Sequence, residues 1–253
     1  MNDQGYYDYY DKIFSGKNYK EETEKVLSIN YDLTGNLPKR ILDVGCGTGT
    51  HDFFLTEKEC MVVGLDLDLK IIEAAKKKAE SFQGIKPKFL CMDVNDLNDK
   101  GFDMAISLFN VINYIPTIKD LQNFFQAIHE RLKPNCLYIF DCWNGIAAIL
   151  DNPRIKSSRI DNNGEIIEII TKPETDIFHQ KVTVMNHVKV IRKTGENVEF
   201  QFNYNQTLWT PMCLTNILQM SGFEVINVST WMQPNIKAVR DTWKIMFTTK
   251  KIG

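Results

Sequence analysis

The chain has 253 residues, of which 43% are hydrophobic and 25% are charged, and its formal net charge is −2. This composition is that of an ordinary globular protein and excludes the collagen-like and disordered classes. Acidic and basic residues are mixed along the chain, without the basic stripe of a nucleic-acid-binding protein, and no apolar run approaches the roughly 20 residues that cross a bilayer. We therefore expect a packed protein that binds neither nucleic acid nor a membrane.

The six cysteines form no C-x-x-C pair, and most of them lie in apolar, strand-like runs. Buried small hydrophobic residues show this pattern, so neither a metal site nor a disulfide framework is indicated. The segment from Met1 to Asp11 is rich in tyrosine and acidic residues and lacks the apolar centre of a signal peptide. These features predict a cytoplasmic, reduced protein.

The first part of the chain predicts a helix followed by alternating strands and helices. Residues 20–33 have apolar side chains at helical spacing, and Gly35 and Pro38 end the helix. From Arg40 onward we expect strands over residues 41–44, 61–65, 88–92, 104–108 and 137–140, and helices over residues 50–58, 69–81 and 118–132, with a shorter connection near 94–100. Near-continuous apolar strands between helices indicate a parallel sheet covered on both faces, and right-handed crossovers make it doubly wound.

The pattern changes after Trp143. Residues 166–170, 182–190 and 198–208 alternate with a period of two between turn residues, which predicts antiparallel hairpins. A helix over residues 210–222 follows, with Thr210 as N-cap and Pro211 at the first position. Residues 223–229 and 243–249 then form the last two strands, an antiparallel pair at one sheet edge.

Together these elements predict an α/β fold: a doubly wound, mainly parallel, seven-stranded sheet with an antiparallel β insert. The expected division is an N-terminal helical segment over residues 1–38, a core of residues 39–150 and 210–253, and an insert over residues 151–209.

The strongest local signal is the glycine turn Asp43-Val-Gly-Cys-Gly-Thr-Gly49, where a strand ends and a helix begins. Glycines permit a tight turn and a close backbone approach, and the helix N-terminus offers N–H groups to an anionic part of a ligand. The turn predicts a nucleotide-like ligand, although a glycine-rich turn without a ligand is an alternative. A dinucleotide fingerprint needs a third glycine at Thr50, so the spacing argues against NAD.

Two carboxylates follow the next strands. Asp66 ends the second strand, where it can accept hydrogen bonds from both hydroxyls of a ribose, and Asp68 competes for this role. Asp93 ends the third strand and can accept from the exocyclic amine of an adenine, with Met92 and Val94 against the ring. The alternative for Asp93 is an N-cap of a short helix.

The glycine turn, the two aspartates and the five strands resemble the class I S-adenosylmethionine-dependent methyltransferases over residues 39–143, with a weaker match over 210–249. The resemblance implies that the chain binds S-adenosyl-L-methionine and releases S-adenosyl-L-homocysteine. It assigns to the donor site Asp43, Gly45, Cys46, Gly47, Gly49, Asp66, Leu67, Met92, Asp93 and Val94.

The N-terminal segment adds a finer resemblance. Tyr10-Asp11, Phe14 and Gly16-Lys-Asn-Tyr19 look like small-molecule enzymes that methylate amino groups of nucleotide-linked sugars. In those relatives N-terminal tyrosines close over the donor, and an antiparallel insert covers the acceptor. The resemblance therefore adds Tyr10 and Tyr19 to the donor site, with aromatic packing of an N-terminal helix as the alternative.

The fourth strand ends in Leu108 and Phe109, which we expect beside the donor, because loops at the carboxyl ends of parallel strands face the ligand. The Asn-Pro-Pro-aromatic sequence of DNA amine methyltransferases is absent there, which argues against a nucleobase acceptor. Tyr114 and the insert histidines His179 and His187 are the candidate catalytic residues. An imidazole can serve as general base, but either histidine can equally be an ordinary strand residue.

The sequence thus predicts an N- or O-methyltransferase for a small polar acceptor, such as a nucleotide-linked amino sugar or a cell-surface polysaccharide precursor. We expect a monomer or homodimer with a small-molecule partner. The alternative is a non-catalytic donor-binding protein that acts as a sensor or partner platform, and an oxidoreductase is disfavoured by the glycine spacing.

Overall fold

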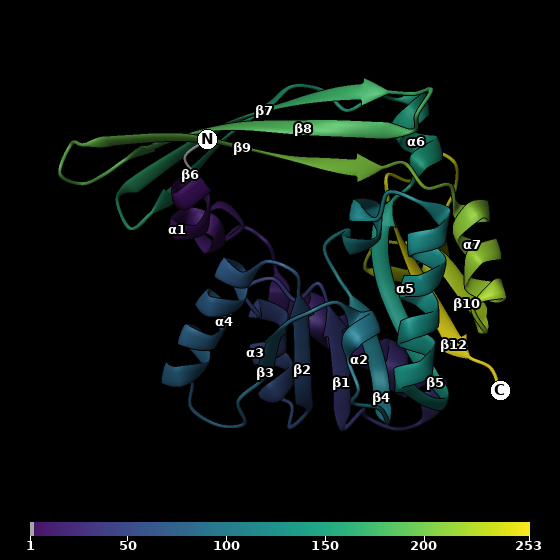
Figure 1. Ribbon diagram of the computed structural model, residues 1–253. Coiled ribbons are helices and arrows are strands. Elements are labelled where there is room, and N and C mark those ends of the chain that lie inside the picture. Colours follow the sequence, from purple (N-terminus) through teal and green to yellow (C-terminus); the bar gives the residue numbers. More distant parts are fainter. Residues whose placement is uncertain (1–2) are drawn as a thin grey trace.

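The structure is a computed structural model that describes residues 3–253. It contains an eight-stranded sheet of order β11-β10-β12-β5-β4-β1-β2-β3 and a four-stranded antiparallel sheet of order β6-β7-β8-β9 (Figure 1). None of the described helices is long and apolar enough to span a bilayer.

The large sheet has a parallel part and an antiparallel edge. The parallel strands are β1 (Arg40–Val44), β2 (Met61–Asp66), β3 (Lys88–Cys91), β4 (Phe102–Ser107) and β5 (Leu132–Trp143). The antiparallel strands are β10 (Phe223–Thr230), β11 (Gln233–Lys237) and β12 (Lys244–Lys251), of which β12 pairs with β5.

The helices are α1 (Asp3–Ile13), α2 (Tyr19–Thr34), α3 (Thr50–Thr56), α4 (Leu69–Ser81), α5 (Ile118–Arg131), α6 (Gly145–Leu150) and α7 (Pro211–Met220), with single 3₁₀ turns η1 (Val94–Asp96) and η2 (Val111–Tyr114). The second sheet, which we call the insert, consists of β6 (Lys156–Asn162), β7 (Glu165–Asp176), β8 (Lys181–Ile191) and β9 (Asn197–Thr207).

Alternate residues of the parallel strands pack against opposite helix layers. Ile41 of β1 and Met104 of β4 lie in one cluster with Val26 of α2. Leu42 of β1 packs on the other face, in a cluster with Phe125 of α5. Because the side-chain period of a strand is two, a strand that is apolar at every position is buried on both faces. The α/β fold expected from the sequence is therefore confirmed.

The strand counts differ from the expectation. The large sheet has eight strands rather than seven, because Gln233–Lys237 adds β11 at its edge. The insert likewise has four strands, since Lys156–Asn162 forms β6. Both segments are polar edge strands, which have only one neighbour, so they carry little of the apolar alternation that identifies a strand.

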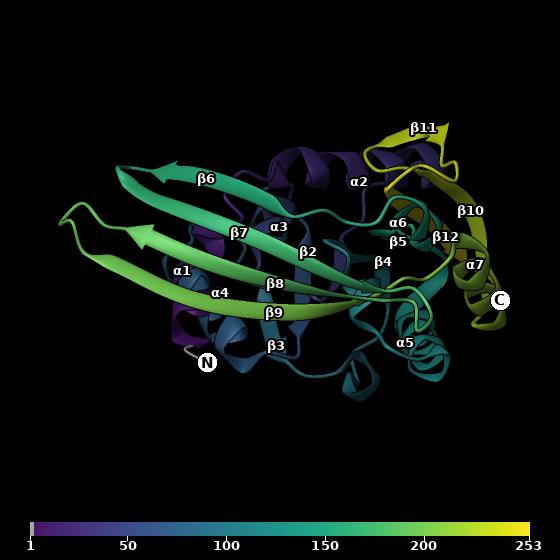
Figure 2. The same cartoon turned by 90° about the horizontal axis from the view of Figure 1, so that it is seen from above.

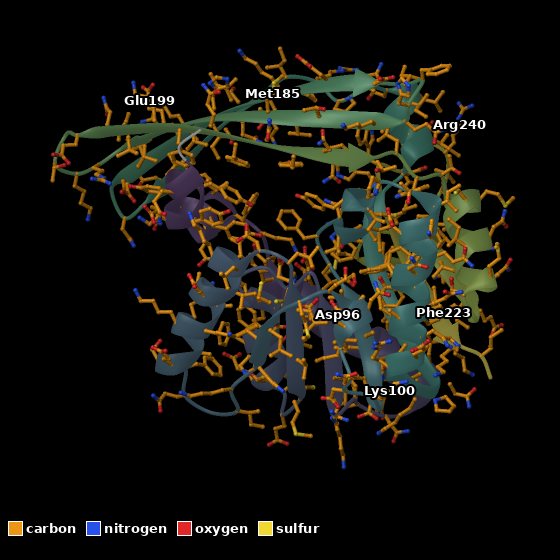
Figure 3. All side chains as sticks on the ribbon, in the orientation of Figure 1. Asp96, Lys100, Met185, Glu199, Phe223 and Arg240 are labelled. Atoms are coloured by element: carbon orange, nitrogen blue, oxygen red, sulfur yellow. The ribbon has the colours of Figure 1, made fainter. Side chains whose placement is uncertain are left out.

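The insert lies across the carboxyl ends of the parallel strands, with α1 between it and the large sheet (Figures 1 and 2). Tyr9 and Ile13 of α1 share an apolar cluster with Ile167, Val188 and Phe200 of the insert. Met185 and Glu199 are on the insert strands at positions that alternate with these buried residues (Figure 3). One face of the insert therefore packs on α1, and the other faces away from the main sheet.

Candidate active site

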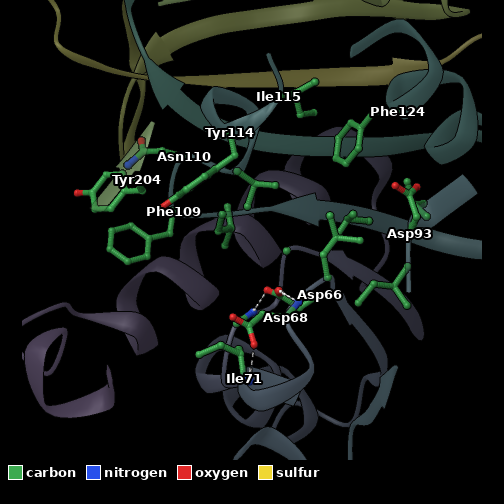
Figure 4. A pocket seen from close by; sticks show the side chains of 18 of the residues that line it. Asp66, Asp68, Ile71, Asp93, Phe109, Asn110, Tyr114, Ile115, Phe124 and Tyr204 are labelled. Atoms are coloured by element: carbon green, nitrogen blue, oxygen red, sulfur yellow. Dashed lines mark hydrogen bonds between the residues drawn. The ribbon is translucent and has the colours of Figure 1, made fainter. Parts of the chain in front are cut away.

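A cavity of about 570 Å³ opens beneath the insert, at the carboxyl ends of the parallel strands. Its walls come from the glycine turn, the loops after β2, β3 and β4, helix α1, turn η2 and strand β9. In Figure 4, Asp93 and Phe124 lie at one end, Phe109 and Tyr204 at the other, and Asp66 and Asp68 at the glycine turn. Ligands of open α/β sheets bind at this edge, and the volume suits a small molecule.

The glycine turn is held against the next strand. The backbone N–H groups of Gly45 and Cys46 both donate to the carbonyl oxygen of Leu65, at 2.7 and 2.9 Å. Gly45 has φ +85°, and a Cβ there would lie within 3.0 Å of the Val111 side chain. A residue with a side chain would therefore meet both backbone strain and a steric clash at this position.

Asp66 braces the turn from β2. One carboxylate oxygen accepts from the N–H of Gly47 at 3.0 Å, and the other accepts from the N–H of Asp68 at 3.0 Å. Burial raises the pKa of the Asp66 carboxyl, because desolvation disfavours its charged form. Asp68 in turn accepts a hydrogen bond from the Tyr7 hydroxyl at 2.9 Å, which ties α1 to the rim of the cavity.

Asp93 caps the 3₁₀ turn η1 and also lines the cavity. Its Oδ1 accepts from the backbone N–H of Asn95 at 2.8 Å and from the Asn95 side-chain amide at 2.7 Å. Met92, Val94 and Phe124 line the cavity with it. The capping alternative is therefore observed, and the role of Asp93 toward an adenine stays a prediction.

Asp141 is a functional candidate that the sequence reasoning missed. Its fully buried carboxylate accepts from the backbone N–H groups of Phe109 and Asn110, at 2.6 and 3.2 Å, and pairs with Lys244 at 3.0 Å. Phe109 and Asn110 have φ of +77° and +62°, a conformation that is costly for residues other than glycine. In the sequence, the signal that could have identified Asp141 is a single carboxylate near the end of the apolar strand β5.

A buried ionic cluster lies behind the glycine turn. Lys17 pairs with Glu22, which also contacts His51 Nε2 at 2.8 Å. Burial lowers the pKa of Lys17 to about 7, and the positive charge of Lys244 acts in the same direction. Tyr19 packs edge-on to the His51 ring at 4.8 Å. The cluster anchors the start of α2 to the glycine turn.

Four tyrosines from three elements surround the insert side of the cavity. Tyr6 and Tyr10 of α1 lie with ring centroids 5.4 Å apart, and Tyr114 of η2 lies 5.8 Å from Tyr204 of β9. Burial raises the pKa of all four hydroxyls above the ordinary tyrosine value, so they stay protonated at neutral pH. The tyrosines thus form a neutral aromatic wall.

The structure brings most of the sequence-predicted site residues to one place. Those that line the cavity are Tyr10, Gly45, Gly47, Asp66, Leu67, Met92, Asp93, Val94, Leu108, Phe109 and Tyr114. Four others do not line it: Asp43 and Cys46 are buried within the glycine turn, Gly49 precedes α3, and Tyr19 lies in the ionic cluster.

The two insert histidines do not reach the cavity. His179 lies in the exposed turn between β7 and β8 and pairs with Asp176 at 2.7 Å. His187 is exposed on β8, where its neighbours Asn186 and Val188 are buried. Successive side chains of a strand point to opposite faces, so His187 lies on the face away from α1. Neither placement supports a catalytic base.

Residues 41–135 match the profile of a family described as a methyltransferase domain. This part of the chain is therefore similar to methyltransferase domains. The matched range contains the strands from β1 to β4, the glycine turn and both strand-end aspartates, and it ends near the start of β5.

Two curated relatives resemble about half of the chain in sequence. A putative methyltransferase of Bacillus subtilis, YqeM, is 32% identical over 142 residues, which cover 54% of each chain. The dTDP-3-amino-3,4,6-trideoxy-alpha-D-glucopyranose N,N-dimethyltransferase of Streptomyces venezuelae is 27% identical over 142 residues, 54% of this chain and 56% of the relative. The chain spans about half the length of the curated relatives it matches.

The likeness in fold covers nearly the whole chain. An S-adenosylmethionine-dependent methyltransferase from Clostridium acetobutylicum superposes with a TM-score of 0.81 over 97% of this chain and 96% of its own, at 21% identity. At this identity the likeness establishes the fold, with the insert and the N-terminal helices included.

Proposed function

We propose that the protein is an S-adenosylmethionine-dependent methyltransferase and that it methylates an amine nitrogen of a small polar acceptor. The observation that carries the proposal is the cavity itself, which joins the glycine turn and the strand-end aspartates to an aromatic wall under the insert. The first part suits a nucleotide-like donor, and the second suits a small molecule.

The lining residues fit the proposed donor. Asp66 stands where the two hydroxyls of a ribose would donate to it, beside the glycine turn that permits close approach. Met92 and Val94 offer apolar surface for an adenine. Asp93 uses only Oδ1 in the hydrogen bonds that cap η1, which leaves Oδ2 to accept a hydrogen bond from the ligand. Bound there, S-adenosylmethionine supplies an electrophilic methyl group on a sulfonium.

Nitrogen is favoured over oxygen as the methylated atom by the chemistry of the aromatic wall. Methyl transfer is an in-line displacement, which depends chiefly on positioning. A hydroxyl acceptor needs a base, but among the described residues no histidine or lysine lines the cavity, and the tyrosines of the aromatic wall stay protonated. The carboxylates that line the cavity, those of Asp66, Asp68, Asp93 and Asp120, come from the end of β2, from the loops after β2 and β3 and from α5 and are not part of the aromatic wall. An uncharged amine carries its own lone pair, so it attacks without a base.

An amino sugar is a suitable example of such an acceptor. The relative from Streptomyces venezuelae is named for N-methylation of a nucleotide-linked amino sugar, and the insert strand β9 adds Tyr204 and Gln206 to the cavity in this chain. Insert residues and N-terminal tyrosines would then enclose the acceptor, while the carboxyl-end loops hold the donor.

Calorimetry with S-adenosylhomocysteine tests the donor site. We expect Asp66→Ala and Asp93→Ala each to weaken binding by about 1–3 kcal/mol, because each removes an acceptor for a buried polar group of the ligand. Asp32→Ala, at an exposed position of α2, serves as the control. Unchanged affinity in a folded Asp66→Ala variant contradicts the ribose assignment, and binding of NADH but not of S-adenosylhomocysteine contradicts the donor.

Turnover separates an enzyme from a sensor. Formation of S-adenosylhomocysteine should be measured across a panel of small amines and the corresponding alcohols. We expect turnover with amines and none with the alcohols. A protein that binds S-adenosylhomocysteine tightly but turns over no acceptor would instead be the non-catalytic donor-binding protein.

A further inference from the structure

The four tyrosines Tyr6, Tyr10, Tyr114 and Tyr204, which we call the tyrosine chamber, form a structured enclosure. Phe202 supports it from β9, with ring centroids 4.6 Å from Tyr6 and 6.4 Å from Tyr204. On the donor side, the Tyr10 hydroxyl lies against Gly47, where a Cβ would be 3.1 Å away. The chamber therefore begins next to the glycine turn and ends at the insert.

Side-chain hydrogen bonds hold the three elements of the tyrosine chamber in place. The side-chain amide of Asn113 in η2 donates to the carbonyl oxygen of Thr207 in β9 at 2.8 Å, and Trp209 Nε1 donates to the carbonyl oxygen of Ile115 at 3.2 Å. On the other side, the hydroxyl of Thr48 in the glycine turn donates to Asp11 of α1 at 2.6 Å. The tyrosine rings are thus preorganised by the fold.

The charged side chains that line the cavity all have one sign. Asp66, Asp68, Asp93 and Asp120 line it, and among residues 3–253 no lysine, arginine or histidine does. An anion brought into the tyrosine chamber would lose its hydration and would meet no lysine, arginine or histidine among the described lining residues, which is strongly unfavourable. A cation would meet carboxylates and tyrosine faces.

Three lysines of segments close to the cavity are already engaged. Lys17 pairs with Glu22, and Lys244 pairs with the buried Asp141. Lys70 lies over the ring of Tyr7 at 4.7 Å from its centroid. None of these three faces the cavity as a partner for a phosphate or a carboxylate.

We propose that the tyrosine chamber selects the acceptor by charge: it takes an amine or ammonium group and rejects phosphate and carboxylate groups. This inference rests on the proposed function and narrows the class of acceptor molecules that the protein would methylate. Any anionic part of the acceptor, including a nucleotide diphosphate, lies outside the cavity or is absent from the molecule.

The charge of the reacting groups agrees with this selection. The amine lone pair forms the new N–C bond, the S–C bond breaks with its electron pair passing to sulfur, and the nitrogen-bound proton leaves to water. Both the sulfonium before transfer and the ammonium after it are cations, which the ring faces of tyrosine attract. The same wall therefore suits the reactant and the product.

Binding of small probes tests the charge selection directly. The full chain, saturated with S-adenosylhomocysteine, is titrated with tetramethylammonium, with its neutral isostere tert-butyl alcohol and with inorganic phosphate, and binding is followed by ligand-observed NMR. We expect tetramethylammonium to bind at least about 3-fold more tightly than the alcohol, on the scale of one or two cation–π contacts, and phosphate not to bind in the cavity.

Substitutions test whether tetramethylammonium binds at the tyrosine chamber. Tyr204→Leu and Tyr114→Leu should each weaken tetramethylammonium binding about 3- to 30-fold, while Tyr204→Phe and Tyr114→Phe keep a ring and should stay within about 3-fold. Tyr114 lines the cavity and belongs to none of the apolar core clusters, so its replacement leaves the core intact. Phe178→Leu, at an 89% exposed position of the same insert, is the matched control.

The outcomes separate this inference from the proposed function. Equal or weaker binding of tetramethylammonium relative to tert-butyl alcohol, binding of phosphate that Tyr204→Leu and Tyr114→Leu abolish, or no effect of both Leu variants overturns the charge selection. If amines are still methylated in that case, the proposed function stands. Absence of S-adenosylhomocysteine binding in the wild type removes the proposed function itself.

Discussion

At the scale of single residues, the candidate site depends on backbone conformations that few side chains permit. Gly45 adopts φ +85° directly beneath Val111, the first residue of η2. The preceding residues Phe109 and Asn110 take the left-handed conformation that Asp141 stabilises from β5. Two constrained turns therefore meet at the point where donor and acceptor would come together.

We expect Gly45→Ala to weaken S-adenosylhomocysteine binding by at least about tenfold and to lower stability by about 1–3 kcal/mol. The added methyl group meets Val111, and alanine is strained at this φ. Gly16→Ala is the matched control, because a Cβ there has open space. Calorimetry and urea unfolding measure the two effects, and equal behaviour of the two variants would contradict the close approach at Gly45.

At the scale of elements, helix α1 joins the insert to the donor site. Tyr9 stacks on Phe200 at 5.9 Å, its hydroxyl accepts from Arg192 at 3.3 Å, and Lys12 pairs with Glu165. The adjacent helix positions Tyr6 and Tyr10 line the cavity, and Tyr6 also contacts Phe202 of the insert. Because one short helix serves both contacts, loosening the insert should also disturb the donor site.

Phe200→Ala should lower the stability of the α1–insert contact by about 3–5 kcal/mol, the usual cost of truncating a buried phenylalanine. Phe200 is 5% exposed and Phe178 is 89% exposed, so Phe178→Ala on the same insert should change stability by less than about 0.5 kcal/mol. Amide hydrogen exchange in α1 is the measurement. Unchanged protection of α1 in Phe200→Ala would show that the helix is held by the core instead.

At the scale of the whole molecule, buried ionisable groups around the glycine turn make stability depend on pH. Burial raises the pKa of Asp43 and of its neighbour Asp52 above the ordinary carboxyl value. Between about pH 4 and neutrality the folded chain therefore binds more protons at this pair than the unfolded chain does. The contribution of the pair to the free energy of unfolding falls as the pH rises through this window.

Asp43→Asn should remove much of this dependence. Relative to wild type, the variant should gain more than about 1 kcal/mol in free energy of unfolding between pH 5 and pH 7.5, because its amide stays neutral at both values. Urea unfolding at several pH values measures the difference, with exposed Asp32→Asn as the control. Wild-type and Asp43→Asn profiles that run parallel would contradict the raised pKa.

Much of the part of the cavity proposed to bind the donor could be predicted from the sequence. The apolar strands, the glycine turn, Asp66 and Asp93 are all local signals at strand ends. The carboxyl ends of parallel strands meet at one edge of a sheet, so a parallel sheet necessarily brings these residues close together. The polar edge strands β6 and β11 were missed, since little apolar alternation marks them.

Only the tertiary structure determines which residues lie together at the proposed acceptor side of the cavity. Tyr6, Tyr114 and Tyr204 come from three distant segments, and they meet because the insert folds back over the sheet and packs on α1. The same packing turns His187 away from the cavity, although strand alternation with the buried valines of β8 already indicated its face. Residue type and spacing determine which element forms, but contacts between remote segments determine which side chains share a cavity.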